Sequence, residues 1–255
     1  MTTLRIDLAY NGAEFAGWAS QPGKRTVQAE LETALATVLR EPAKLTVAGR
    51  TDAGVHALGQ VASLESGASP AGDLRESLNG LTGHDLVVHA AAPTADGFDA
   101  RRDALSRTYC YRVHASPVPS PFERGLALWW PYRLDPEALH ACAAALVGRH
   151  DFTAFTRTDS AHVHFERDVL RAEWRATAPA EGSPGMAPIG AVFEFWIESR
   201  AFMRSMVRVL VGTMLEVAGG RRELADFERL LRGAPREEAG DTARPHGLYL
   251  AEIRY

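Results

Sequence analysis

One acidic side chain, Asp52, stands among basic and small residues in the stretch AGRTDAGVHALGQVASL. Arg50 lies two residues before it and His56 four residues after it. A carboxylate with a nearby imidazole suits metal-dependent phosphoryl hydrolysis, but this stretch supplies no further acidic ligands. Aspartate and glycine are also ordinary turn formers, so Asp52 could simply cap a polar loop. The stretch alone leaves the catalytic and the structural interpretation open.

Three other side chains invite a chemical interpretation. Tyr109 and Tyr111 fall on one face of an expected strand, where paired tyrosines more often belong to the core. Arg208 lies in the apolar run MVRVLVG, and a buried charge of this kind requires a partner. A structural ion pair and a functional pairing with an acidic residue both satisfy that requirement.

The segment AHVHFERD contains two histidines, His162 and His164, between Asp159 and Asp168. An H-x-H pattern places both rings on one face of a strand, which is compatible with metal binding. We nevertheless expect no metal site here, because the segment offers no convincing ligand set.

The composition is that of an ordinary globular protein of 255 residues with 46% hydrophobic content, enough for one large domain or two modest ones. The start, MTTLRIDLAY, does not resemble a secretory leader, and no long uncharged apolar run occurs, so we expect a cytoplasmic location. Cys110 and Cys142 cannot form a disulfide framework or a four-thiolate metal site. We expect both to be buried free thiols.

The net charge of −4 argues mildly against a nucleic-acid partner, but the distribution of charge points the other way. All but two of the 28 basic residues are arginines, the exceptions being Lys24 and Lys44. Several arginines cluster in sequence: Arg101, Arg102, Arg107 and Arg112; Arg200, Arg204 and Arg208; Arg221 and Arg222. Arginine binds phosphate bidentately and stacks on bases, so these clusters could form a basic groove. A general compositional bias toward arginine is the alternative.

Hydrophobic periodicity predicts the elements that must position these residues. In the first part of the chain we expect strands at 3–10, 44–48, 60–64 and 86–91, and helices at 27–39 and 73–81, the first capped by Thr26. Asp52 then falls at a turn between two strands.

In the second part we expect strands at 108–113, 126–130, 169–176, 192–199 and 247–255, and helices at 136–147, 202–217 and 224–231. This order predicts an α+β fold in two similar halves, residues 1–104 and 105–255, with a mostly antiparallel sheet covered by helices on one face.

Four stretches together resemble the tRNA pseudouridine synthase A family. They are GRTDAGVHA, FDARRDALSRTYCYRV from Phe98, AFMRSMVRVLVGTMLEVAGG from Ala201, and ARPHGLYLAEIRY from Ala243. YNGAEFAGW near the start and RTVQAELETAL in the first helix agree with the family as well. The resemblance implies the pseudouridine synthase fold, in which two α/β-sandwich halves share a mixed, mostly antiparallel sheet with the active-site cleft between them.

The resemblance also implies a reaction. The C1′–N1 bond of a uridine breaks, the uracil rotates in place, and C5 is joined to C1′, without cofactor or metal. By the family motif, Asp52 is the carboxylate that acts as nucleophile or base, Tyr109 contacts the base, and Arg208 pairs with Asp52. An adjacent guanidinium favours the ionised form of a carboxylate, which supports that pairing.

The implied substrate is the anticodon arm of tRNA, at positions 38, 39 and 40, bound by a homodimer. Extrusion of the uridine costs a few kcal/mol, and Arg50 is placed to fill the gap in the stack. We expect further RNA contacts from His56, Gln60, Arg101, Arg102 and Arg107. A non-catalytic RNA-binding module is the main rival, but binding alone gives no reason to place an anion in a basic groove.

A first prediction concerns salt. If phosphate contacts dominate binding despite the net charge of −4, the affinity for tRNA should fall steeply as salt rises. A log–log plot should have a slope of about −0.7 to −0.9 per phosphate contacted. A filter-binding titration at several salt concentrations measures it, and an affinity that does not change with salt would contradict the basic groove.

Overall fold

The computed structural model describes residues 1–68, 72–158, 163–177 and 190–255, and it divides into two compact units. Unit 1 comprises Met1–Arg107 together with Tyr249–Tyr255, and unit 2 comprises Thr108–Leu248. The sequence placed a boundary near residue 105 and kept the last strand in the second half. In the structure that strand belongs to unit 1, because it pairs with a strand of that unit.

Unit 1 is built on a mixed sheet with the strand order β4-β1-β3-β10, to which β2 adds by pairing with β3. These strands are β1 (Thr2–Tyr10), β2 (Thr46–Val47), β3 (His56–Ser66), β4 (Leu86–Pro93) and β10 (Leu248–Arg254). β1 pairs antiparallel with β3 and β4, whereas β10 runs parallel to β3 and places Tyr249 opposite His56. The strand pair β2–β3 therefore brackets the segment that contains Asp52.

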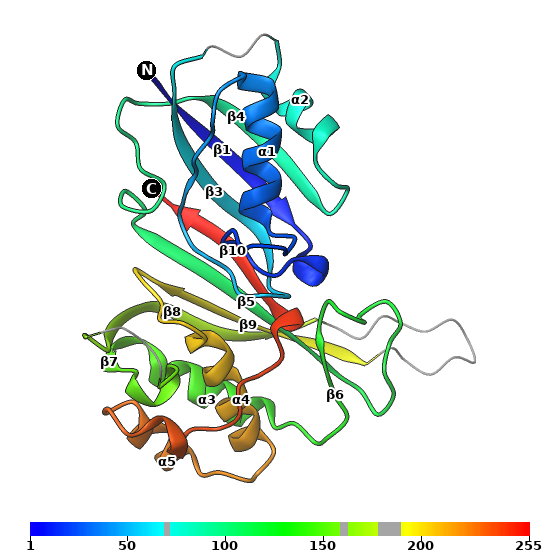
Figure 1. Cartoon of the computed structure of the whole chain (residues 1–255). Coiled ribbons are helices and arrows are strands. Elements are labelled where there is room, and N and C mark those ends of the chain that lie inside the picture. The colour runs from blue at the N-terminus through cyan, green and yellow to red at the C-terminus, as the bar shows by residue number, and fades with distance from the viewer. Residues whose placement is uncertain (69–71, 159–162, 178–189) are drawn as a thin grey trace. The chain divides into compact units, whose positions relative to one another are not determined.

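Two helices, α1 (Val27–Leu39) and α2 (Leu74–Leu81), pack side by side, and α2 lies against β4 (Figure 1). The Thr26 side chain caps α1 by accepting the Ala29 N–H, and Asp73 caps α2 by accepting the Glu76 N–H. Apolar residues at helical spacing form the buried face of α1. Both helices and the Thr26 cap agree with the expectation from sequence.

Unit 2 contains the strand order β5-β9-β8-β7, with β6 pairing parallel to β5. The strands are β5 (Ser106–Ala115), β6 (Leu128–Trp130), β7 (Gly148–Asp151), β8 (Glu166–Ala176) and β9 (Ala191–Ser199). Antiparallel pairing joins β7 to β8 and β8 to β9. The sequence patterns did not predict β7, which is short and mostly polar.

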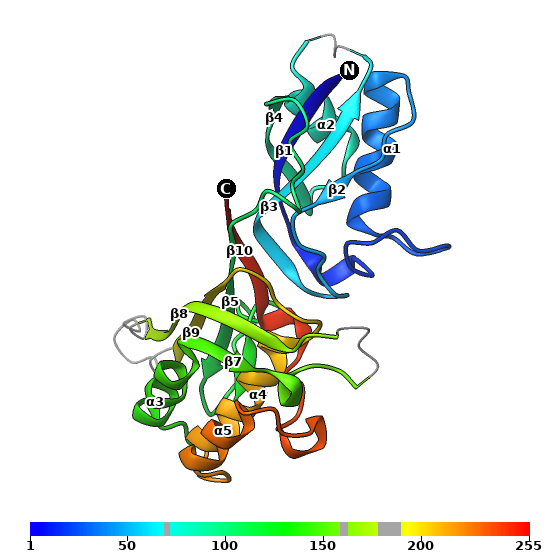
Figure 2. The same ribbon diagram turned by 90° about the vertical axis from the view of Figure 1, so that its left-hand side faces the viewer.

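Three helices gather on one side of the strands β7, β8 and β9 (Figure 2). They are α3 (Pro136–Leu146), α4 (Met206–Ala218) and α5 (Leu224–Leu230). The expected helix start at residue 202 is wrong, because Ser205 has a φ of 61° and the Met206 N–H closes a turn onto the Met203 carbonyl. The helix therefore begins at Met206.

The remaining helical elements are single 3₁₀ turns: η1 (Gly12–Glu14), η2 (Thr153–Phe155), η3 (Arg236–Glu238) and η4 (Pro245–Gly247). Both cysteines are buried free thiols, and burial raises the pKa of Cys110 and of Cys142 to about 12. Within the described ranges, no helix has the length and apolar character needed to cross a membrane. The α+β class with a mixed, mostly antiparallel sheet is confirmed.

Gly212 of α4 lies close to the backbone of the loop at Asp241. A Cβ at this position would overlap the Asp241 carbonyl oxygen, which is backbone and cannot rotate away. Gly212→Ala should therefore destabilise the protein by about 1–3 kcal/mol, as overpacking does. Urea unfolding measures the change.

Gly80 provides the matched control, because it also lies in a helix, α2, and nothing surrounds its missing Cβ within 4 Å. Gly80→Ala should be neutral or stabilise by up to about 1 kcal/mol, since alanine costs less entropy in a helix. Equal effects of the two substitutions would contradict the packing argument.

Candidate active site

Asp52 occupies a tight turn between β2 and β3. The Val55 N–H donates to the Asp52 carbonyl at 3.2 Å, and Gly54, the third residue of this turn, has a φ of 75°. Only glycine adopts that conformation without strain, so the turn explains why glycine stands two residues after Asp52. The Asp52 side chain is half-buried, while Arg50 is exposed.

The segment around η1 supports this turn from one side. The Trp18 N–H donates to the Thr51 carbonyl at 3.0 Å, and the Gly54 N–H donates to the Phe15 carbonyl at 3.3 Å. Gly17 lies between them with a φ of 99°, and a Cβ there would lie 2.8 Å from the Thr51 oxygen. Glycine is thus required at position 17 both by its backbone angle and by the close approach of the Asp52 turn.

A buried polar network supports the turn from inside the unit. The hydroxyls of Tyr10 and Thr51 share a hydrogen bond of 2.7 Å, and the Gln60 amide donates to the Gly49 carbonyl at 2.7 Å and to the Tyr10 hydroxyl at 3.3 Å. Burial raises the pKa of Tyr10 to about 12, so the phenol remains neutral at physiological pH. On the two sides of Arg50, the Gly49 backbone is therefore held by a side chain of β3 and the Thr51 side chain by a side chain of β1.

His56 anchors the other end of the turn. Its Nδ1 accepts the Gly12 N–H at 3.0 Å, which leaves the ring proton on Nε2. The ring stacks on Tyr249 with 4.6 Å between centroids and is only 1% exposed. His56 and Gln60 are predicted above to contact RNA, but both side chains lie in the interior of unit 1. Their burial favours a role in holding the Asp52 turn.

Besides Arg50, three arginines are expected to contact RNA, and their environments differ. Arg101 and Arg102 are exposed, and Asp99 accepts both of their backbone N–H groups at 2.8 Å. The Arg102 guanidinium also pairs with Asp103 at 3.1 Å. Arg107 is half-buried, and its guanidinium faces backbone carbonyl oxygens.

In unit 2 the structure distinguishes the two tyrosines of the TYCY stretch. Tyr111 is fully buried, and its hydroxyl donates to the Arg244 carbonyl at 2.8 Å. Burial raises its pKa, so it stays protonated. Tyr109 is half-buried and meets Phe202 edge to face, with centroids 4.9 Å apart. No sequence pattern indicated that Phe202, in the stretch AFMR, is a neighbour of Tyr109.

Arg208 lies in the first turns of α4 and is oriented by the segment before η4. Its Nε donates to the Ala243 carbonyl at 2.7 Å, and the Ala243 N–H donates back to the Arg208 carbonyl at 3.1 Å. Burial and the nearby Arg244 lower the pKa of His246, which keeps this imidazole neutral at physiological pH. The pairing of Arg208 with Asp52 joins residues of different units and stays a prediction.

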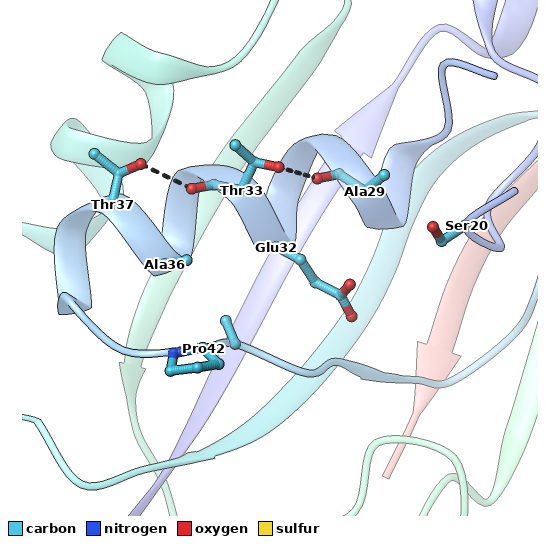
Figure 3. Close-up of a pocket in the computed structure, with 8 residues that line it drawn as sticks. Ser20, Ala29, Glu32, Thr33, Ala36, Thr37 and Pro42 are labelled. Carbon is cyan, nitrogen blue, oxygen red and sulfur yellow. Dashed lines mark hydrogen bonds between the residues drawn. The ribbon is translucent and has the colours of Figure 1, made fainter. Parts of the chain in front are cut away.

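Two other features are the H-x-H segment and a groove along α1, and neither contains a predicted catalytic or RNA-contacting residue. Among the described residues no group of three or more His, Cys, Asp and Glu side chains could hold a metal ion. His162 of the H-x-H pair lies outside the described residues, and His164 is exposed. A groove along α1 contains none of the predicted site residues (Figure 3). Its Thr33 and Thr37 hydroxyls donate to helix carbonyls.

Sequence reasoning missed several residues that hold the Asp52 turn: Tyr10, Gly12, Gly17, Trp18 and Thr51. The available signal was the spacing of glycines and aromatic residues in YNGAEFAGW, which matches no regular helix or strand.

Proteins similar to this chain match it over its whole length. A family model described as tRNA pseudouridine synthase matches residues 8–101 and 142–255, ranges that include Asp52 and Arg208 but not Tyr109. A protein of Frankia casuarinae called tRNA pseudouridine synthase A is 43% identical over 262 residues, which cover 100% of this chain and 90% of the relative.

Two relatives with the same name come from other bacteria. The Lacticaseibacillus casei protein is 38% identical over 257 residues, covering 100% of both chains. The Thermus thermophilus protein is 40% identical over 257 residues, covering 100% of this chain and 97% of the relative. The family model covers most of the chain and the relatives match it over its full length, and the chain therefore belongs to the tRNA pseudouridine synthase family of isomerases.

Proposed function

We propose that this chain isomerises uridine to pseudouridine at positions 38, 39 and 40 in the anticodon stem-loop of tRNA, with Asp52 as the catalytic carboxylate. The observation that carries the proposal is the Asp52 turn itself. The turn is held by side chains of β1 and β3 and by the backbone of the η1 segment, while the Asp52 side chain remains half-buried rather than enclosed in the core. Such an arrangement preorganises a carboxylate toward a substrate.

The reaction conserves atoms and electrons. The C1′–N1 bond breaks, the C1′–C5 bond forms, C5 loses its proton and N1 gains one. No net oxidation or reduction occurs, so the chemistry requires no cofactor. Asp52 assists either by attacking the nucleoside or by removing a proton from it, and both roles require the ionised carboxylate.

The second unit supplies the partners of that carboxylate in this proposal. Arg208 pairs with the Asp52 carboxylate, and the hydrogen bond from its Nε to the Ala243 carbonyl orients the guanidinium. The Tyr109 ring stacks on the extruded uracil, supported by edge-to-face contact with Phe202.

Recognition of the RNA is assigned to exposed arginines. Arg50, exposed two residues before Asp52, fills the space that the extruded nucleotide leaves in the stack. Arg101 and Arg102, exposed on the loop after β4, contact backbone phosphates. We further propose that the protein acts in the cytoplasm as a homodimer that receives one tRNA across both subunits.

The test of the proposed function is Asp52→Asn. The substitution keeps the size of the side chain and removes its charge, so isomerisation should be abolished. Binding should persist, because the assigned phosphate contacts lie on other residues, and loss of an anion from a basic surface can tighten the complex. Release of tritium from [5-³H]uridine in an anticodon stem-loop measures turnover, and filter binding measures affinity for the same RNA.

Asp96→Asn is the matched control, because Asp96 is an exposed aspartate of the same unit. It should retain wild-type turnover. If Asp52→Asn also retains turnover, Asp52 is only a turn residue and the catalytic assignment is wrong. If the wild-type chain binds the stem-loop without forming pseudouridine, the result contradicts the proposed activity and supports the rival interpretation as an RNA-binding module.

A further inference from the structure

The guanidinium of Arg107 is surrounded by main-chain carbonyl oxygens. Its Nε and Nη2 donate to the Ala48 oxygen at 3.2 and 3.0 Å, and Nη2 also donates to the Arg101 oxygen at 2.7 Å. Nη1 donates to the Ala104 oxygen at 3.2 Å. A guanidinium offers five N–H donors in one plane, and these contacts use four of them. Little donor capacity is left for a phosphate.

The three carbonyls belong to two separate segments of unit 1. Ala48 is buried and lies four residues before Asp52, immediately after β2. Arg101 and Ala104 belong to the loop between β4 and β5. One side chain therefore ties the segment that leads into the Asp52 turn to a loop more than fifty residues further along the chain.

That loop is itself fixed to the sheet. The Ala100 N–H donates to the Ser63 hydroxyl on β3 at 3.0 Å, and the Tyr255 hydroxyl donates to the Ala100 carbonyl at 2.8 Å. The Leu105 N–H donates to the Arg254 carbonyl at 2.8 Å. Arg107 thus connects the Asp52 segment to a fixed support rather than to a second movable loop.

We propose that Arg107 is a positioning residue for Asp52 and not a phosphate ligand. The inference rests on the proposed function of Asp52 and adds a role to it. The neighbouring exposed arginines Arg101 and Arg102 take the phosphate contacts, whereas Arg107 fixes the backbone from which the catalytic loop starts. The planar fork matters, because three separate nitrogens reach the three carbonyls, whereas a lysine would have to bind all of them from one ammonium nitrogen.

The distinguishing experiment uses Arg107→Lys and Arg107→Gln in the full chain. We measure the single-turnover rate on a saturating anticodon stem-loop, and the affinity at several salt concentrations. Both variants should lose rate by about 100-fold, the effect of displacing a catalytic group by about 1 Å. Both should keep the wild-type affinity and salt slope, because no phosphate contact is lost.

Two controls separate positioning from binding and from general stability. Arg101→Ala should weaken binding and make the salt slope shallower by about one. Arg5→Lys alters another arginine of unit 1, which pairs with Asp7 and lies over the rings of Phe98 and Tyr255. It should lower the unfolding midpoint in urea without changing the single-turnover rate of the folded enzyme.

The result that overturns the proposal is an Arg107→Lys variant with wild-type rate, or an Arg107→Gln variant with weaker affinity and a shallower salt slope. If the wild-type chain forms no pseudouridine, the proposed function fails and this role fails with it. An active wild type with an active Arg107→Lys variant overturns the positioning role alone.

If the Arg107 variants do not fold, chemical modification of the wild-type protein tests the proposal instead. Phenylglyoxal modifies accessible arginines, and peptide mass spectrometry locates the modified residues. Arg107 should resist modification with and without the stem-loop, whereas Arg101 should react in the free enzyme and be protected by RNA. Modification of Arg107 that RNA prevents would overturn the proposal.

Discussion

The feature on which the rest of unit 1 depends is a short turn whose main-chain groups are bound by side chains and backbone from distant segments. The Ala48 carbonyl accepts from the Arg107 side chain, and the Gly49 carbonyl accepts from the Gln60 side chain. The Thr51 carbonyl accepts from the Trp18 N–H. A polar backbone inside a protein is costly unless each group is paired, so these bonds are needed for stability. They also restrict where the Asp52 side chain can point.

Glycines allow the backbone segments to approach closely enough to form these hydrogen bonds. Gly17 approaches the Thr51 carbonyl too closely for any Cβ, and Gly54 needs a positive φ to close the turn. At Gly12, a Cβ would overlap the Val55 carbonyl. Glycine in these positions has a conformational cost, which the surrounding network offsets. The dense glycine spacing of the sequence therefore reflects one crowded contact between two loops.

Unit 2 uses the same physical device around a different residue. Arg208 exchanges two hydrogen bonds with Ala243, in the segment before η4. The next residue of that segment is held by the buried Tyr111 hydroxyl, which donates to the Arg244 carbonyl. Only glycine fits at position 247, because a Cβ there would lie 2.8 Å from the Tyr111 ring. In each unit, a charged side chain proposed for catalysis lies on backbone that buried polar groups hold in place.

Local sequence patterns predicted most of the elements and the turn at Asp52. The helix at 27–39 with its Thr26 cap follows from apolar spacing and a capping residue, which act between neighbours in the chain. The start of α4 was missed, since the positive φ of Ser205 is unusual for serine and no local pattern signals it. The short polar strand β7 was missed because it carries no apolar alternation.

The roles of identical residue types were decided only by the tertiary structure. Arg101, Arg102 and Arg107 are equivalent in a sequence, yet two are exposed and the third binds carbonyls brought together from positions 48, 101 and 104. His56 and Gln60 are likewise interior because their partners, Gly12, Tyr249, Tyr10 and Gly49, are contributed by other segments. The sequence determined which side chains were available for catalysis and RNA contact, because residue type and local spacing suffice for that. Burial and hydrogen-bond partners depend on contacts between distant segments, so only the folded chain assigns each side chain its place.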